Sequence, residues 1–169
     1  QILGEYLTDR LTEEAVSFIK SHSEGPFFLH LSHHAVHTVL QAPDSLINKY
    51  RNKTPGKYHK NPIYAAMIEK LDDSVGRICQ VIKTLGIADR TIVIFYSDNG
   101  GSEPVTDNYP LNGGKGMPYE GGSRVPLIIR WTGKIEGGIR SSVPITGVDF
   151  YPTFVTLAQG KICLLYTSP

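Results

Sequence analysis

The chain has 169 residues, of which 40% are hydrophobic and 20% are charged, and its formal net charge is +1. This composition predicts one soluble unit with a hydrophobic core. The balanced charge and the lack of a polybasic run argue against nucleic acid or an anionic membrane as the partner, and no apolar stretch reaches the length of a membrane span.

The first part of the chain is predicted to form a helix, a strand and a long loop. Residues 6–22 show the apolar spacing of an amphipathic helix, with Thr8 or Asp9 placed to accept the free N–H groups at its start. After a Gly-Pro break, "FFLHL" at 27–31 reads as a short buried strand. The polar stretch 33–61 is then expected to be a long loop, which is typical of a functional or mobile segment.

The second part of the chain alternates helices with apolar strands. Apolar residues recur at steps of three and four over 63–86, which predicts a helix that begins at a proline and ends at a glycine. A strand starting at Thr91 should follow, then a Gly/Pro/Asn-rich loop, a strand at 125–131, and a helix at 149–160 capped by Asp149. Helices that feed apolar strands favour an α/β fold.

The strand that begins at Thr91 ends abruptly in Asp98, Asn99 and two glycines. Ligands bind beyond the carboxyl ends of strands in open α/β sheets, and a carboxylate beside an amide oxygen suits Ca²⁺ or Mg²⁺ better than zinc. The same four residues are also typical of a turn, in which Asx side chains bond to their own backbone. Taken alone the stretch favours the turn, and a calcium ion would need further acidic ligands from elsewhere.

Four histidines, His30, His33, His34 and His37, lie within one short window. Three interpretations are open. An ordinary polar loop with a partly buried histidine ranks first. A site in which an imidazole binds an anion or protonates a leaving oxygen ranks second. A zinc site ranks third, because the segment lacks cysteine and the helical His-Glu-x-x-His arrangement.

The stretch "LNGGKGMPYEGGSRVP" surrounds Lys115 with glycines. Glycines let the backbone approach a ligand closely, and the lysine would bring a point charge to the site. The spacing differs from that of a phosphate-binding P-loop. The alternative is a surface loop with a solvated lysine, and Glu120 and Arg124 are expected to pair and shape its return into the next strand.

The order of these features resembles the type I sulfatases, the arylsulfatase-like branch of the alkaline phosphatase superfamily. The match covers most of the chain from Tyr6 to Gly160 and is carried by "PFFLHLSHHAVHTVLQAP", "YAAMIEKLDDSVGRI", "IVIFYSDNGG", "GGKGMPYEGGSRVPLIIRW" and "VDFYPTFVTLAQG". The resemblance implies part of an alkaline-phosphatase-like α/β fold, with a mixed, mostly parallel sheet flanked by helices.

The resemblance also implies roles for individual residues. Asp98 and Asn99 match two ligands of the family's single divalent cation, with Ca²⁺ expected before Mg²⁺. Lys115 matches the lysine that contacts the sulfate oxygens. His37, in "AVHT", matches the histidine that binds the sulfate group and assists the leaving oxygen. These groups would stabilise negative charge as a sulfate ester is cleaved.

The chain departs from the family in several places. The Cys/Ser-x-Pro-x-Arg motif, which gives the formylglycine nucleophile, is absent, and the two early acidic metal ligands belong upstream of residue 1. Val39 stands where the family has proline after His-Thr, while Tyr64 and Asp72 match helix positions with a structural role. We therefore expect residues 1–160 to be the C-terminal part of a sulfatase catalytic domain, inactive alone, and 161–169 to be an atypical tail whose native origin is left open.

The expected activity is hydrolysis of a small-molecule or glycan sulfate ester, with aryl sulfates and sulfated carbohydrates both open as substrates. The alternatives are a phosphate or phosphonate monoester hydrolase of the same superfamily, or a non-catalytic glycan-binding pseudo-enzyme. By resemblance the protein is expected in the periplasm or outside the cell, and its oligomeric state is left open. The basic segment "NKTPGKYHKNP" is expected to be a solvated loop. The alternative is that it borders a cleft for a polyanionic sugar.

Overall fold

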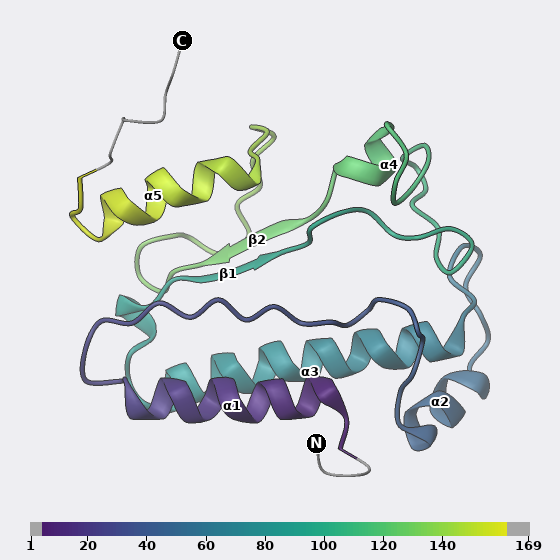
Figure 1. Ribbon diagram of the computed structural model, residues 1–169, viewed down its shortest axis with the longest axis horizontal. Helices are drawn as coiled ribbons and strands as arrows, with labels where there is room; N and C mark the ends of the chain where they lie inside the picture. The colour runs from purple at the N-terminus through teal and green to yellow at the C-terminus, as the bar shows by residue number, and fades with distance from the viewer. Residues whose placement is uncertain (1–4, 162–169) are drawn as a thin grey trace. The chain divides into compact units, whose positions relative to one another are not determined.

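A computed structural model describes residues 5–161 of the chain, which divides into two compact units, residues 1–136 and 137–169. In the first unit the elements are α1 (Leu7–Ser21), α2 (Asp44–Arg51), α3 (Pro62–Thr84), the 3₁₀ turn η1 (Ala88–Arg90), β1 (Val93–Tyr96), α4 (Glu120–Ser123) and β2 (Leu127–Arg130) (Figure 1). In the second unit they are η2 (Gly147–Asp149) and α5 (Phe150–Leu157).

The two long helices confirm the predictions for 6–22 and 63–86 to within two residues. Proline stands at the first position of α3, and the Asn61 side chain accepts the N–H groups of Ile63 and Tyr64 at 3.0 and 3.1 Å, so this helix has a defined start. The cap predicted for α1 is wrong. No side chain caps that helix, and Thr8 is instead a buried residue within it.

The loop predicted over 33–61 contains a helix, α2, that the sequence reading missed. Its buried residue is Ile47, and its Lys49 ammonium lies 2.6 Å from a carboxylate oxygen of Glu69 on α3. The hydrogen bond from Lys49 lowers the pKa of Glu69. Eight residues with one buried apolar side chain give a weak periodic signal, so this helix depends on its contact with α3.

The two strands pair antiparallel, from Val93 opposite Arg130 to Tyr96 opposite Leu127. The prediction of a mostly parallel sheet is therefore wrong for the residues described. A parallel pair needs a crossover connection, usually a helix. The segment 97–126 between these strands contains only the four-residue α4 and reverses the direction of the chain.

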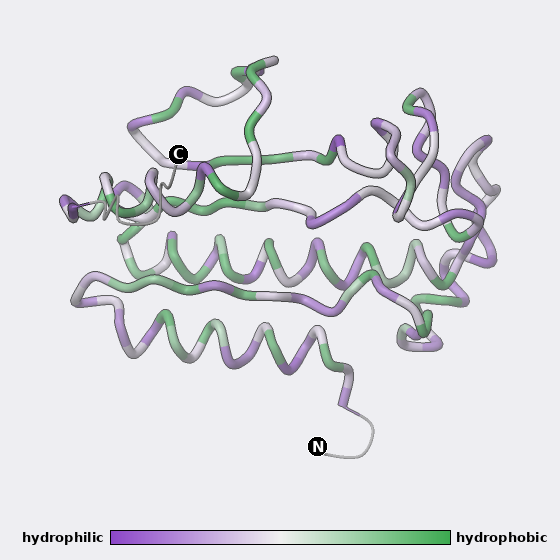
Figure 2. Tube along the Cα trace, turned by 45° about the horizontal axis from the view of Figure 1, so that its top comes forward, coloured by the Kyte–Doolittle hydropathy of each residue, from purple (hydrophilic) through white to green (hydrophobic). Residues whose placement is uncertain are grey.

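The segment 27–31, predicted as a strand, lies outside this sheet. It is extended, but the sheet of the described residues contains β1 and β2 alone. Figures 1 and 2 show the segment running lengthwise beside α1 and α3. Phe27 and Leu29 pack against a buried cluster whose members are Ile19, Ile82 and Ile87. The apolar residues of 27–31 therefore pack against helices. Periodicity alone cannot distinguish this packing from packing within a sheet.

In the second unit Asp149, which was predicted to cap the last helix, instead caps the preceding turn η2. The Asp149 carboxylate accepts the Thr146 N–H at 2.7 Å, which closes η2 in a capping box, and its side chain makes no cap bond to α5. Within residues 5–161, no helix combines the length and the hydropathy needed to cross a bilayer.

Candidate functional site

The end of β1 forms a tight corner in which the two candidate metal ligands touch. The Asn99 amide donates to the Asp98 carboxylate at 2.7 Å, and the Ser97 hydroxyl donates to the Asn99 carbonyl at 2.9 Å. The Asp98 side chain is exposed and Asn99 is half-buried. The turn interpretation expected Asx side chains bonded to their own backbone, whereas here the Asn99 amide bonds to the neighbouring carboxylate and holds the two side chains together at the strand end.

The chemical type of the side-chain donors at this corner, oxygen atoms, suits a hard cation. The hydrogen bond between the two side chains leaves the second carboxylate oxygen of Asp98 and the amide oxygen of Asn99 without a partner among the described residues. Oxygen donors of this type are the ligands of Ca²⁺. Two residues do not complete a calcium site, and residues 5–161 contain no group of three His, Cys, Asp or Glu side chains placed to hold a metal.

The backbone around Lys115 is hydrogen-bonded to this corner. The Lys115 N–H donates to the Gly101 carbonyl at 2.9 Å, and the Gly100 N–H donates to the Gly122 carbonyl at 3.0 Å. The Lys115 side chain itself is exposed. Main-chain hydrogen bonds on both sides of the lysine therefore bring together the Asp-Asn strand end and the lysine loop. The sequence predicted these two segments as candidate sites independently of each other.

Glycine is required where these segments meet. A Cβ atom on Gly100 would overlap the carbonyl of Gly121, and one on Gly121 would overlap the carbonyl of Gly113. A Cβ on Gly114 would lie 2.6 Å from the Gly101 carbonyl oxygen. The obstacles are backbone atoms, which cannot rotate away as a side chain would. The glycines flanking the lysine thus permit close backbone contact as well as tight turns.

Asn108 is a positioning residue that the sequence reading missed. Its side chain accepts the Gly101 N–H at 2.8 Å and donates to the Gly101 carbonyl at 3.0 Å, so it holds both polar groups of one residue. An asparagine in a Gly/Pro-rich loop was the available signal, but only the tertiary structure identifies its partner. The predicted pair of Glu120 and Arg124 is confirmed at 3.0 Å, with both side chains exposed.

The histidine cluster separates into a structural member and exposed members. His33 is half-buried, its Nε2 atom lies 3.1 Å from the Ser74 hydroxyl of α3, and its Nδ1 atom is buried with no partner among the described residues. Burial lowers the pKa of His33 below its ordinary value. This is the partly buried loop histidine that ranked first among the interpretations.

His37 is exposed, and its contacts in the described chain are local. Its Nδ1 atom lies 2.7 Å from the Thr38 carbonyl, and its ring centroid is 5.3 Å from that of His34. No hydrogen bond or ion pair described within 5–161 joins His37 to Asp98 or Lys115. The structure therefore joins the lysine loop to the strand end, while the role of His37 stays a prediction.

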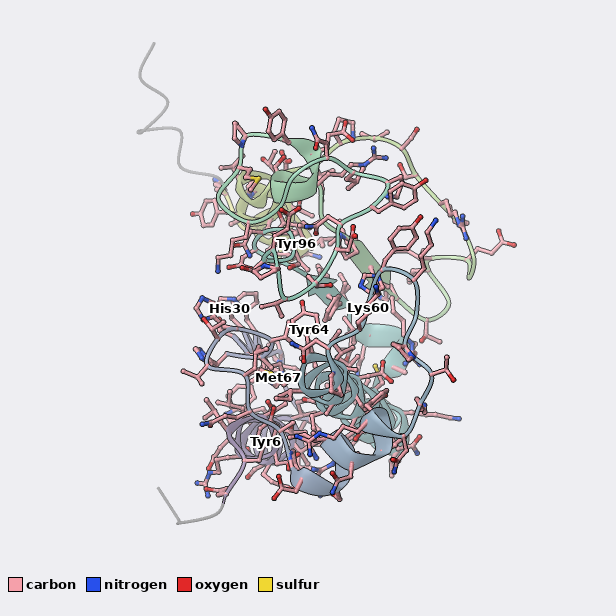
Figure 3. All side chains as sticks on the ribbon, turned by 90° about the vertical axis from the view of Figure 1, so that its right-hand side faces the viewer. Tyr6, His30, Lys60, Tyr64, Met67 and Tyr96 are labelled. Carbon is pink, nitrogen blue, oxygen red and sulfur yellow. The ribbon has the colours of Figure 1, made fainter. Side chains whose placement is uncertain are left out.

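A hollow of about 300 Å³ adjoins this corner. Gly101, which accepts the Lys115 N–H, lines it together with Tyr64 from α3 and Lys60 from the preceding loop. Figure 3 shows Lys60 and Tyr64 near each other at the start of α3. Burial raises the pKa of Tyr64, so the phenol stays neutral over the physiological range.

Comparison with protein families gives one match that covers nearly the whole chain. The sequence model of a family described as Sulfatase matches residues 1–161. A sulfatase of Formosa agariphila is 39% identical over 94% of this chain, and human steryl-sulfatase is 35% identical over 92%. The chain spans 31% of the first relative and 27% of the second.

Solved structures give the same result for the fold. The crystal structure of Ps i-CgsB in complex with k-i-k-neocarrahexaose matches 94% of this chain with a TM-score of 0.86 and 38% identity, and this chain covers 35% of that protein. The PsFucS1 sulfatase from Pseudoalteromonas sp. matches 91% of the chain with a TM-score of 0.76 and 32% identity. The resemblance inferred from the motifs is thereby confirmed.

Proposed function

This chain belongs to the sulfatase family, and on that basis we propose that the whole protein is a sulfuric ester hydrolase that cleaves sulfate monoesters. One observation carries the proposal: the 2.9 Å hydrogen bond from the Lys115 N–H to the Gly101 carbonyl. It fixes the backbone of a cationic residue against Gly101, two residues after Asn99, whose side-chain amide donates to the Asp98 carboxylate. A site that stabilises a sulfate anion needs positive groups from several segments held in this way.

In the proposed mechanism, residues of this chain bind and orient the sulfate group. Lys115 contributes a fixed positive charge to the sulfuryl oxygens, and His37 donates a proton to the leaving oxygen. Asp98 and Asn99 contribute two oxygen ligands to a calcium ion, which when bound would neutralise charge on the sulfate oxygens. The nucleophile, a formylglycine by family resemblance, would come from outside the sequence described, so the chain by itself is expected to be inactive.

A sulfated carbohydrate is the substrate class that we favour for the whole protein. The support is the similarity to Ps i-CgsB, which was crystallised with k-i-k-neocarrahexaose. Aryl and steryl sulfates are the second candidate, because human steryl-sulfatase is also a relative, at 35% identity.

The proposal is tested on the full-length protein that contains this chain. Hydrolysis of 4-nitrophenyl sulfate is compared with that of 4-nitrophenyl phosphate, and sulfate release is measured from sulfated oligosaccharides. We expect turnover of sulfate esters well above that of the phosphate, and Lys115→Ala should lower kcat/KM by about 100- to 1,000-fold. Lys134→Ala, which removes an exposed lysine elsewhere in the same unit, is the matched control.

The other functions predict different results. A phosphohydrolase would prefer the phosphate ester, and a glycan-binding pseudo-enzyme would bind sulfated oligosaccharides without releasing sulfate. If Lys115→Ala and Lys134→Ala have equal kinetic constants, the role proposed for Lys115 is wrong.

A further inference from the structure

The hollow beside the candidate site continues into a second and larger one. Their volumes are about 300 and 550 Å³, within the range of about 300–1,000 Å³ that small-molecule sites occupy. Both lie between the loop 57–61 and the loop 101–108, and the residues that line both are Lys60, Asn61, Val105, Thr106 and Asp107. Because they share these residues, the two hollows form one groove, the 60–107 groove.

Contacts between the two loops hold the walls of this groove in place. The His59 Nδ1 atom lies 3.1 Å from the Thr106 hydroxyl. The rings of Tyr58 and Tyr109 stack with their centroids 4.6 Å apart and 14° between their planes. Within the first loop, the Lys57 ammonium lies 4.9 Å from the centroid of the Tyr58 ring. A groove whose walls are joined on two sides loses less conformational entropy on binding than one between free loops.

Several polar side chains of the groove are already hydrogen-bonded within the protein, and the others indicate a ligand. Asn61 caps α3, and Asn108 holds both polar groups of Gly101. The Lys60 ammonium and the Tyr64 hydroxyl have no hydrogen bond or ion pair described within residues 5–161. An ammonium and a neutral phenol can both donate to the oxygens of an anionic group.

The charge of the groove argues against a simple anion as its ligand. Glu103 and Asp107 also line it, together with Lys57 and Lys60. One oxygen of Asp107 accepts the Tyr109 N–H at 2.7 Å. Carboxylates repel a free sulfate but accept hydrogen bonds from hydroxyl groups. A ligand that carries one sulfate and several hydroxyls matches both kinds of side chain.

We propose that the 60–107 groove binds a second sulfated sugar residue, next to the one whose sulfate is removed, with Lys60 pairing with its sulfate and the carboxylates accepting its hydroxyls. The inference rests on the proposed function, because the groove reaches the candidate site through Gly101, which lines it and accepts the Lys115 N–H. It adds a specificity site that would select a sulfated oligosaccharide over a small sulfate ester.

The test uses the full-length protein and a panel of sulfated hexasaccharides prepared from carrageenan, chondroitin sulfate and heparin, each with its desulfated form. Affinity is measured by calorimetry, and hydrolysis of 4-nitrophenyl sulfate is measured in parallel. Lys60→Ala should weaken binding of the preferred sulfated hexasaccharide by about five- to tenfold, because it removes one charge-assisted contact. Turnover of the small ester should be unchanged, and Lys60→Arg should restore the affinity.

Lys83→Ala is the matched control, since Lys83 is an exposed lysine in the last turn of the helix that follows Lys60. Tyr64→Phe should produce a smaller loss of affinity with the fold intact. Equal hexasaccharide affinity of Lys60→Ala and Lys83→Ala would overturn the inference, as would failure of every sulfated hexasaccharide to bind. If a sulfated hexasaccharide binds in a way that depends on Lys60 but no sulfate is released, the result would support the groove as a binding site and overturn the proposed function.

Discussion

The His33 imidazole lies 3.1 Å from the Ser74 hydroxyl, and this contact ties the histidine segment to α3. The Ser74 hydroxyl is in turn 2.6 Å from that of Thr12 on α1, which lies 2.6 Å from the Thr8 carbonyl. Ser74 and Thr12 are 2% and 1% exposed. The three segments are therefore joined by a continuous polar chain, and His33 lies four residues before the candidate sulfate ligand His37.

The stability of the protein should fall as the pH falls below about 6.5, in part because of His33. Burial lowers the pKa of His33 in the folded state, so the unfolded chain takes up the proton first and stability is lost as the pH drops from the unfolded pKa toward the folded one. His33→Gln removes this titration and should flatten the pH dependence of Tm. His30→Gln, at an exposed histidine, is the control, and an unchanged slope in His33→Gln would contradict the assignment.

Ser74→Ala should reduce the free energy of unfolding by about 1–3 kcal/mol, because it leaves the Thr12 hydroxyl and the His33 ring without their shared partner. Ser17→Ala serves as the control, because Ser17 is an exposed serine of α1. Chemical unfolding of the full-length variants measures both changes. Similar values for the two variants would show that the buried polar chain contributes little.

Gly121→Ala should lower activity more than it lowers stability. The new Cβ would overlap the Gly113 carbonyl, and relief of that overlap must displace the backbone that holds the lysine loop to the strand end. The expected loss of stability is about 1–3 kcal/mol, with a larger relative loss in kcat/KM on a sulfate ester.

Gly76→Ala is the matched glycine variant for this comparison. A Cβ there meets nothing within 4 Å, and the residue lies inside α3, so the substitution should stabilise the protein by about 0.5–1 kcal/mol and leave kcat/KM unchanged. If Gly121→Ala is equally active, close backbone contact is not what positions Lys115.

Removal of calcium should lower both the activity and the Tm of the full-length protein, because a ligand that binds only the folded state stabilises it. Asp98→Asn replaces the carboxylate of a proposed ligand with a neutral amide and should raise the calcium concentration for half-maximal Tm shift by at least about tenfold. Asp89→Asn, at an exposed aspartate of η1, is the control. A calcium-dependent Tm shift that is identical in the two variants would exclude Asp98 as a ligand.

Local chemistry in the sequence was sufficient for the two long helices, α1 and α3, and for selecting the candidate corner. The apolar spacing and the flanking Pro62 and Gly86 define α3 without any tertiary contact, since a helix is stabilised by residues three and four apart. The ordered motifs likewise predicted the family, and the Asp98–Asn99 pair was interpreted from the sequence alone as either a turn or part of a metal site.

Only the tertiary structure decided the contacts between segments distant in sequence. The sequence could not show that β1 and β2 run antiparallel, that 27–31 packs on helices, or which of four histidines is buried, because each outcome depends on a partner distant in the chain. The hydrogen bond from the Lys115 N–H to the Gly101 carbonyl likewise depends on a partner that the sequence does not identify. Residue types and spacing determined which groups this protein offers to the proposed anion and cation site, whereas close packing of backbone, possible only where glycines remove Cβ atoms, decided which of their segments meet.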